Sequence, residues 1–139
     1  MAVATHRLTI SAGEDLDIVD ITVAVQQAVA KGSIKDGTVT IFAVGSTASV
    51  STMEFEPGLV KDLAAAMERI APSDDDYAHH QTWNDGNGKS HVRATVLGPS
   101  LTVPFQDRKL LLGTWQNIVL LDFDVPARRR EVVLQVLGE

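Results

Sequence analysis

The sequence predicts an α+β fold built as a single domain over residues 1–139. Two segments, 17–31 and 57–70, carry apolar residues at helical spacing, whereas the second half of the chain contains a succession of short strand-like segments. Because these strands follow one another instead of alternating regularly with helices, the pattern favours α+β over a doubly wound sheet. A chain of 139 residues fits one core, and no repeat, linker or low-complexity tract divides it.

The N-terminal part predicts one strand followed by one helix. Residues 6–11 alternate between apolar and polar side chains, which is typical of a half-buried strand, with His6 on its polar margin. Residues 17–31 carry an apolar stripe, so we expect a core-facing helix that Asp17 caps and Gly32 ends. The stripe consists of Ile18, Ile21, Val25, Ala28 and Val29.

The middle of the chain predicts two strands and a second helix. Residues 38–44 and 50–55 are rich in β-branched residues and are joined by the small-residue turn 45–48. The helix over 57–70 begins with proline at the first helical position, where the missing N–H costs nothing, and a second proline at position 72 ends it.

The last third of the chain predicts strands only. Short strands over 101–105 and 110–112 are linked by a turn. A nearly continuous apolar strand follows over 116–124, and residues 130–137 alternate as the final strand.

Composition restricts the classes of function. The formal charge of −6 and a pI near 5.1 argue against broad binding of nucleic acid or anionic membranes, but a few local cations suffice for a small phosphorylated ligand. The absence of cysteine excludes disulfides, thiolate metal ligands and a cysteine nucleophile. We find neither a signal-peptide pattern nor a run of eighteen apolar residues, so we expect no membrane span and a cytoplasmic location.

Candidate chemistry concentrates in residues 77–116, which hold three of the four histidines and both tryptophans. His79, His80 and His91 lie among too few apolar residues to be buried as core filler. Imidazole ligates late divalent metals and transfers protons near neutral pH, so metal binding and proton transfer both stay open for His79 and His91. The adjacent His80 would point elsewhere, and the tryptophans are expected in the core or at an interface.

Several neighbours of His91 could contact a phosphate. Lys89 and Arg93 carry the charge and Ser90 a hydroxyl. The alternative is that Lys89 is solvated and Arg93 pairs with a carboxylate. Asn87 sits between two glycines, which either let the backbone approach a ligand or make a turn.

A second candidate anion site is the turn that starts at Gly45. Its backbone N–H groups and the hydroxyls of Ser46 and Thr47 could face an anion, although a simple turn explains the same residues. Downstream, Glu56 is expected to cap the following helix, whereas Glu54 has no such structural explanation.

Seven motifs, in their order along the chain, resemble the YjbQ-like family, which is often labelled secondary thiamine-phosphate synthase. The resemblance covers nearly the whole chain. Many members carry His-Thr-Thr-Ala at positions 45–48 and a histidine at position 89, and a metal site that used either histidine would lack ligands here. The motifs are Gly45-Ser46-Thr47-Ala48, Glu54-Phe55-Glu56-Pro57-Gly58-Leu59, Tyr77-Ala78-His79, Asp85-Gly86-Asn87-Gly88, Ser90-His91, Leu97-Gly98-Pro99-Ser100 with Val103-Pro104, and Leu112-Gly113-Thr114-Trp115-Gln116 with Asp122-Phe123-Asp124.

The resemblance implies two β-sheets packed as a sandwich with two main helices, in a homotrimer whose sheets pack about the threefold axis. It also implies a site at His79 and His91, with Glu54 as the matching acidic position. The labelled reaction joins a pyrimidine diphosphate to a thiazole phosphate and releases pyrophosphate, although the native substrate can differ.

In that reaction, the negative charge on the departing pyrophosphate must be stabilised. Either a divalent metal such as zinc or magnesium or protein groups can do this, here Lys89, Arg93, Ser46 and Thr47. His79 and His91 would hold the metal or donate protons, supported by Glu54. Two other classes stay open: a trimeric module that binds a small ligand or metal without turnover, and a structural trimer whose histidines and tryptophans form the interface.

Overall fold

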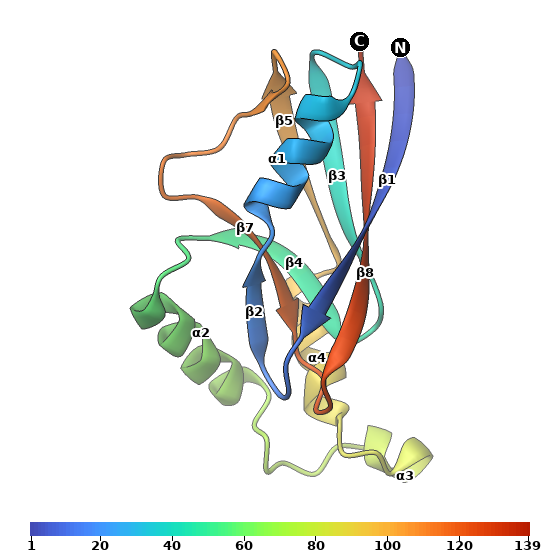
Figure 1. Cartoon of the computed structure of the whole chain (residues 1–139). Coiled ribbons are helices and arrows are strands. Elements are labelled where there is room, and N and C mark those ends of the chain that lie inside the picture. The colour runs from blue at the N-terminus through green and yellow to red at the C-terminus, as the bar shows by residue number, and fades with distance from the viewer.

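Two antiparallel β-sheets form the centre of the computed structural model, which describes residues 1–139 (Figure 1). The five-stranded sheet has the order β1-β8-β3-β5-β6, and the three-stranded sheet has the order β2-β7-β4. The predicted α+β class with two packed sheets is confirmed. The strands are β1 Ala2–Ala12, β2 Asp17–Asp20, β3 Gly37–Val44, β4 Ala48–Met53, β5 Ser100–Gln106, β6 Lys109–Leu110, β7 Asn117–Asp122 and β8 Arg128–Gly138.

Four helices accompany the sheets: α1 Thr22–Lys31, α2 Pro57–Ile70, α3 His79–Trp83 and α4 Gly88–Leu97. Helix α2 has the predicted bounds. The carboxylate of Glu56 accepts hydrogen bonds from the backbone N–H groups of Gly58 and Leu59, so the predicted cap is also confirmed. The longest helix has 14 residues, and none of the four is long and apolar enough to cross a membrane.

The predicted helix start at Asp17 is wrong. Residues 17–20 form strand β2, in which Ile18 pairs with Leu121 of β7. The Asp17 carboxylate accepts the N–H of Gly13 at 2.7 Å instead of capping a helix. Helix α1 begins only at Thr22. Pairing with the buried strand β7 therefore overrides the helical stripe at its first turn.

Helix α4 is a second difference, because the sequence indicated no helix there. Its buried face carries Ser90, Arg93 and Ala94 in place of large apolar residues. The Ser49 hydroxyl of β4 donates to the Ala94 carbonyl at 3.1 Å, which fixes α4 against the three-stranded sheet. A helix whose buried residues are small or polar gives a weak apolar period, and this explains why the pattern was missed.

Two apolar clusters hold the layers together. The larger contains 16 buried residues from α1 and both sheets, among them Ile41 and Leu120. The smaller contains six and lies between the three-stranded sheet, α2 and α4, with Phe123 and Met67 at its centre. The second cluster supports the end of the molecule that carries the candidate histidines.

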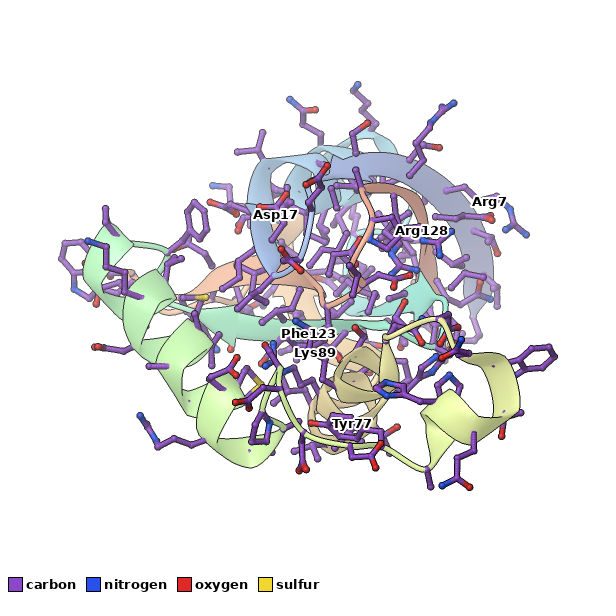
Figure 2. All side chains as sticks on the ribbon, turned by 90° about the horizontal axis from the view of Figure 1, so that it is seen from below. Arg7, Asp17, Tyr77, Lys89, Phe123 and Arg128 are labelled. Atoms are coloured by element: carbon purple, nitrogen blue, oxygen red, sulfur yellow. The ribbon has the colours of Figure 1, made fainter.

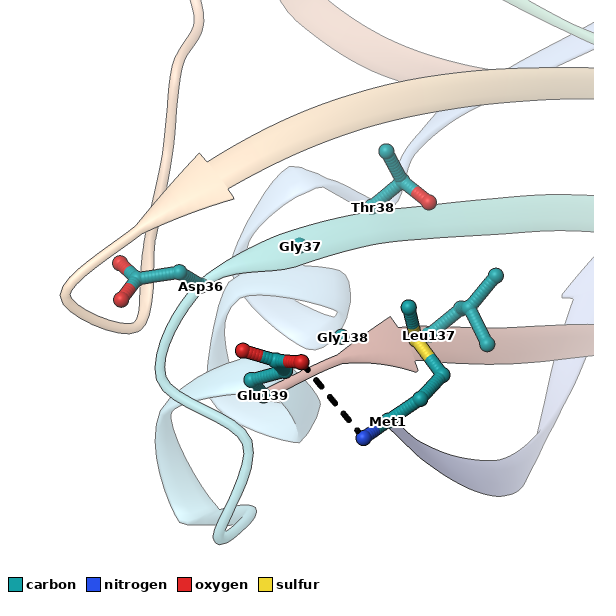
Figure 3. Close-up of a pocket in the computed structure, with 7 residues that line it drawn as sticks. All are labelled: Met1, Asp36, Gly37, Thr38, Leu137, Gly138 and Glu139. Carbon is teal, nitrogen blue, oxygen red and sulfur yellow. Dashed lines mark ion pairs between the residues drawn. The ribbon is translucent and has the colours of Figure 1, made fainter.

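The chain termini meet at the opposite end of the molecule from α3 and α4 (Figure 1). The Met1 ammonium lies 3.7 Å from the Glu139 carboxylate, beside a hollow of about 480 Å³ (Figure 3). None of the residues singled out in the sequence lines this hollow. Trp83 and Trp115 are 70% and 72% exposed, so neither belongs to the core of this chain. Their expected interface role stays a prediction.

Gly88 is required where α4 starts. A Cβ at this position would lie 2.5 Å from the Tyr77 Cβ, which is closer than real side chains approach. We therefore expect Gly88→Ala to lower the free energy of unfolding by about 1 to 3 kcal/mol, measured by urea denaturation. Gly113→Ala is the matched control, because its Cβ would meet only ordinary contacts, 3.6 Å at the closest. Equal stability of the two variants would contradict the prediction.

Candidate functional site

His79 and His91 meet although twelve positions separate them. Helix α3 starts at His79 and ends at Trp83, and the left-handed backbone of the following Asn84 (φ 53°) reverses the chain toward α4. His91 lies in the first half of α4, and the two ring centroids are 4.4 Å apart at a tilt of 49°. The Nε2 atom of His79 also lies 3.6 Å from Oδ1 of Asp85. The structure thus brings together the two histidines that the sequence analysis paired.

His80 has a different environment. Its Nε2 accepts the backbone N–H of Gly88 at 3.2 Å, so this ring satisfies one of the free N–H groups at the start of α4. The Tyr77 ring packs edge-on against it with centroids 5.5 Å apart, and the Tyr77 hydroxyl donates to the Pro72 carbonyl at 2.6 Å. His80 therefore has a structural role beside the paired histidines.

A polar groove of about 350 Å³ opens between the Gly45 turn, the start of α4 and the strand ends β7 and β8. No apolar side chain lines it. Figure 2 views the molecule from below, the end at which Figure 1 places α3 and α4, and labels Arg128 of this groove. We call it the polar groove; its residues are Gly45, Ser46, Thr47, Asn87, His91, Asp124, Arg128, Arg129 and Arg130.

A second hollow of about 200 Å³ adjoins the polar groove and shares Gly45, Ser46 and His91 with it. Its remaining lining is less polar. His91 and the Gly45 turn thus stand between a strongly polar compartment and a mixed one. The remaining residues are Ala48, Ala94, Thr95 and Pro99.

The floor of the polar groove is a buried ion pair between the two sheets. Arg130 of β8 donates from Nε and Nη2 to the two oxygens of the buried Asp122 of β7, at 2.8 and 2.9 Å. Nη2 also donates to the Thr47 hydroxyl at 2.5 Å. A Cβ at Gly45 would lie 2.8 Å from Nη1, so glycine leaves the room that the guanidinium occupies. Arg130 and Thr47 are consequently engaged within the protein.

Asp124 joins this network from the end of β7. Its carboxylate accepts Nε of Arg128 at 2.8 Å and the N–H of Val125 at 2.9 Å. Burial raises the pKa of Asp124, but the hydrogen bonds from Arg128, Val125 and Asn87 outweigh burial and hold the pKa below its ordinary value. Asp124 is therefore a carboxylate at neutral pH.

Arg129 and the outer half of Arg128 supply the available positive charge. Arg129 is exposed, lines the polar groove and makes no ion pair within the chain. Arg128 uses Nε for Asp124, and its side chain is half exposed. Ser46 is also exposed in the groove.

Lys89 and Arg93 do not line the polar groove. The Lys89 ammonium lies 3.8 Å from the Asp15 carboxylate and donates to the Ser73 hydroxyl at 3.0 Å, so it is neither solvated nor near His91's compartment. The buried Arg93 donates to Glu68 at 2.9 Å and to the carbonyl group that ends α2. The carboxylate pairing that the sequence left open for Arg93 is thus the one observed.

Ser90 and Glu54 are also placed apart from the polar groove. Ser90 is fully buried in α4, where its hydroxyl has no hydrogen-bond partner. Glu54 is exposed just beyond β4, whose other end, at Ala48, is near His91. At ~3.3 Å per residue, the six positions from Ala48 to Glu54 span roughly 20 Å. Glu54 therefore does not reach the histidines of its own chain.

Sequence reasoning missed the acidic and arginine side chains of the groove. Asp122 and Asp124 appeared only in the apolar strand and in a family motif. Arg130 was taken as the first residue of the last strand, and Arg128 and Arg129 were given no role. A signal was available, because two aspartates at the end of an apolar strand are followed closely by three arginines. Buried charges in proteins are normally paired.

The salt bridge between Glu68 and Arg93 predicts a response to acid. Hydrogen bonds from the N–H and hydroxyl of Ser73, together with Arg93, lower the pKa of Glu68 to about 2. Because the folded pKa is depressed, the stabilisation is complete above the ordinary value near 4.5 and is lost as pH falls toward 2.

We therefore expect the urea midpoint of wild type to fall more between pH 5 and pH 2.5 than that of Glu68→Gln. Glu14→Gln removes an exposed carboxylate without such partners and should behave like wild type. A Glu68→Gln variant with an unchanged acid response would refute the assignment.

Comparison with known proteins agrees with this fold. The family model described as "UPF0047 protein YjbQ-like" matches residues 6–139. A UPF0047 protein of Archaeoglobus fulgidus is 37% identical over 91% of this chain and 96% of its own length, and one of Methanothermobacter thermautotrophicus is 34% identical over 100% and 95%. Their names state no activity.

Solved structures show the same architecture. The crystal structure of a "YbjQ-like protein of unknown function" from Sulfolobus solfataricus has a TM-score of 0.93 and 34% identity, and the match covers 99% of both chains. A hypothetical protein from Aeropyrum pernix K1 has a TM-score of 0.90 and 29% identity over 98% of this chain and 99% of its own. Because the family model matches residues 6–139 and the relatives match most of the chain in sequence and in fold, the chain belongs to the YjbQ-like UPF0047 family.

Proposed function

We propose that this chain binds a phosphate-bearing small molecule in the polar groove and acts on it. The observation that carries the proposal is the placement of Arg128 and Arg129 in the same wholly polar compartment as His91 and Ser46. Guanidinium groups bind phosphate oxygens in a bidentate manner, and an imidazole can transfer a proton to the leaving oxygen. Such a set suits transfer reactions in which negative charge develops on a departing phosphate.

The adjoining hollow supports a substrate with a second, less polar part. Ala48, Ala94 and Pro99 offer apolar surface next to His91, which suits a heterocyclic ring joined to a phosphate. Within this class, we propose the joining of a pyrimidine diphosphate to a thiazole phosphate, with release of pyrophosphate, as the specific reaction.

In that reaction, Arg128 and Arg129 would hold the pyrophosphate that leaves the pyrimidine carbon, and the Ser46 hydroxyl would donate to it. His91 would protonate the leaving oxygen, with its ring held by contact with His79. Asp124 keeps Arg128 oriented. A divalent cation bound at this edge would share the neutralisation of the diphosphate.

Pyrophosphate alone tests the binding part of the proposal. We expect Arg129→Ala to weaken its affinity by about 10- to 150-fold in calorimetric titration, because one charge-assisted hydrogen bond contributes about 1.5 to 3 kcal/mol. Arg69→Ala removes an exposed arginine of α2 and serves as the control. Absence of saturable binding, or equal loss in both variants, would overturn the groove assignment. Saturable binding without turnover of the two precursors would identify a binding module.

We also propose that three copies assemble through the outer face of the five-stranded sheet. Phe42 on β3, Val133 on β8 and Val3 on β1 lie on this face, and all three are at least partly exposed. Its charges are few, and Arg7 and Glu131 pair with each other. A β-branched and aromatic sheet face of this kind favours burial between subunits. The solution mass from light scattering tests the assembly, and a monomeric mass would exclude it.

A further inference from the structure

We propose that Gly45 and Arg130 form an inner subsite for a phosphoryl group at the floor of the polar groove. The inference rests on the function proposed above and deepens it, because it concerns the same groove and the same class of ligand. Arg130 binds Asp122 and Thr47, but these contacts use only part of its guanidinium. The unused part is what a phosphoryl oxygen would contact.

The guanidinium of Arg130 has two N–H groups without a partner. Of the five N–H donors of an arginine, Nε uses one on Asp122, and Nη2 uses two, on Asp122 and on the Thr47 hydroxyl. Nη1 donates to no group of the protein. The side chain is only 9% exposed, and a buried donor without a partner gains more from an acceptor than an exposed one does.

Gly45 opens this end of the guanidinium to the groove. A Cβ at position 45 would lie 2.8 Å from Nη1, so Nη1 lies directly against the bare Cα of the glycine. Both residues line the polar groove. The one wholly enclosed side-chain atom without a hydrogen-bond partner is Oγ of Ser90, so Nη1 is not sealed within the protein. The two free N–H groups are therefore accessible from the groove beside Gly45.

The turn at Gly45 adds donors of other kinds. No backbone hydrogen bond uses the N–H of Gly45 or Ser46, and the Ser46 side chain is exposed in the groove. Phosphate oxygens accept hydrogen bonds from guanidinium, backbone N–H and hydroxyl groups alike. The inner end of the groove thus combines all three kinds of donor around Nη1.

The charges at and beneath the floor favour an anion. They belong to three arginines, Arg128, Arg129 and Arg130, and to two buried aspartates, Asp122 and Asp124. One positive charge is therefore in excess. The aspartate oxygens already accept hydrogen bonds from the arginines, and Asp122 fixes the orientation of the Arg130 guanidinium. A donor held in place before the ligand arrives loses little conformational entropy on binding.

The groove consequently offers cations at two levels. Arg130 lies in the buried floor, whereas Arg129 is exposed and Arg128 is half exposed. One phosphoryl group at Nη1 of Arg130 and a second at the two outer arginines would engage both levels at once. The inner subsite therefore suits a ligand with two linked phosphoryl groups better than a monophosphate.

The test compares Gly45→Ala with wild type in calorimetric titration with pyrophosphate. The added Cβ covers Nη1, so we expect the affinity to fall at least tenfold, as for the loss of one charge-assisted hydrogen bond. Gly98→Ala is the matched control, because Gly98 also has a positive φ (86°) but its Cβ would meet nothing within 4 Å. It should retain wild-type affinity, and circular dichroism verifies that both variants are folded.

A second readout needs no substitution. In ¹⁵N spectra of the wild type, the backbone amide signals of Gly45 and Ser46 and the Nε–H signal of Arg130 should shift as pyrophosphate is added. The shifts should saturate with the dissociation constant that calorimetry gives. If Gly45→Ala does not fold, these spectra decide alone. Signals that stay fixed at saturation, or wild-type affinity in folded Gly45→Ala, would overturn the inner subsite.

The inner subsite and the function proposed for the groove fail in different ways. A loss of affinity in Arg129→Ala but not in Gly45→Ala overturns only the inner subsite. A loss in Gly45→Ala but not in Arg129→Ala supports the inner subsite and removes the outer one. Pyrophosphate binding that both variants weaken, without turnover of any substrate, supports the subsite and removes the catalytic proposal. Absence of saturable binding to the wild type overturns both.

Discussion

Replacing His91 with alanine is expected to lower turnover of the phosphate substrate by about 10²- to 10⁴-fold, the range in which a positioned general acid contributes. His91 is the titratable side chain common to the polar groove and the adjoining hollow, and the reacting bond of a two-part substrate would lie between these compartments. The affinity for pyrophosphate should change little, because the arginines carry that interaction.

Two measurements separate catalysis from structure. Steady-state kinetics with the two thiamine precursors give turnover, and urea denaturation gives the stability of the same protein. His6→Ala, on strand β1, controls for loss of a histidine outside the groove. Unchanged turnover in His91→Ala would remove the catalytic role, whereas a combined loss of folding and turnover would reduce His91 to a packing residue of α4.

The second large effect is expected at Arg130. Replacing it by methionine should lower the free energy of unfolding by about 3 to 5 kcal/mol, because the buried Asp122 then loses both guanidinium donors and its only ion-pair partner and keeps only the hydrogen bond from the N–H of Asp124. A change of this size exceeds that expected for most single substitutions and should be evident in a urea titration.

Arg129→Met is the control, because Arg129 is exposed and makes no ion pair; its effect on stability should stay within about 0.5 kcal/mol. The double variant Asp122→Asn with Arg130→Met should recover part of the loss, since it no longer buries an unpaired carboxylate. Additive losses in the double variant would mean that the two side chains do not interact as the structure shows.

The sequence patterns predicted the elements in which large apolar residues recur at regular spacing. The stripe of α2 and its Glu56 cap, and the apolar strand that became β7, appear with nearly the expected bounds. Strand β2 did not follow its local pattern. Ile18 would be buried in a helix and in a strand alike, and only its pairing with Leu121 of β7 selects the strand. Helix α4 has a polar buried face, to which a search for apolar stripes is insensitive.

The candidate site was predicted in part for the same reason. His79 and His91 were recognised because histidines are conspicuous in a polar segment, and their contact confirms only that they are neighbours. The pairing of Arg93 with Glu68 and of Lys89 with Asp15 depends on residues far away in the sequence, so both cations looked available when they are not. Arg129 lay outside every predicted element and was given no role, and only the fold, in which it belongs to β8, shows that it lines the groove.

The ion pair between Arg130 and Asp122 joins β8 of one sheet to β7 of the other, directly beneath the groove. A ligand bound there would contact residues held by both sheets, so the sheets could separate only if the ligand dissociated. Hydrogen exchange should register this as slower exchange of core amides in β7 and β8 on ligand binding, reaching the rate of global opening. The exchange rates of the most slowly exchanging amides would then report how much of the protein has ligand bound.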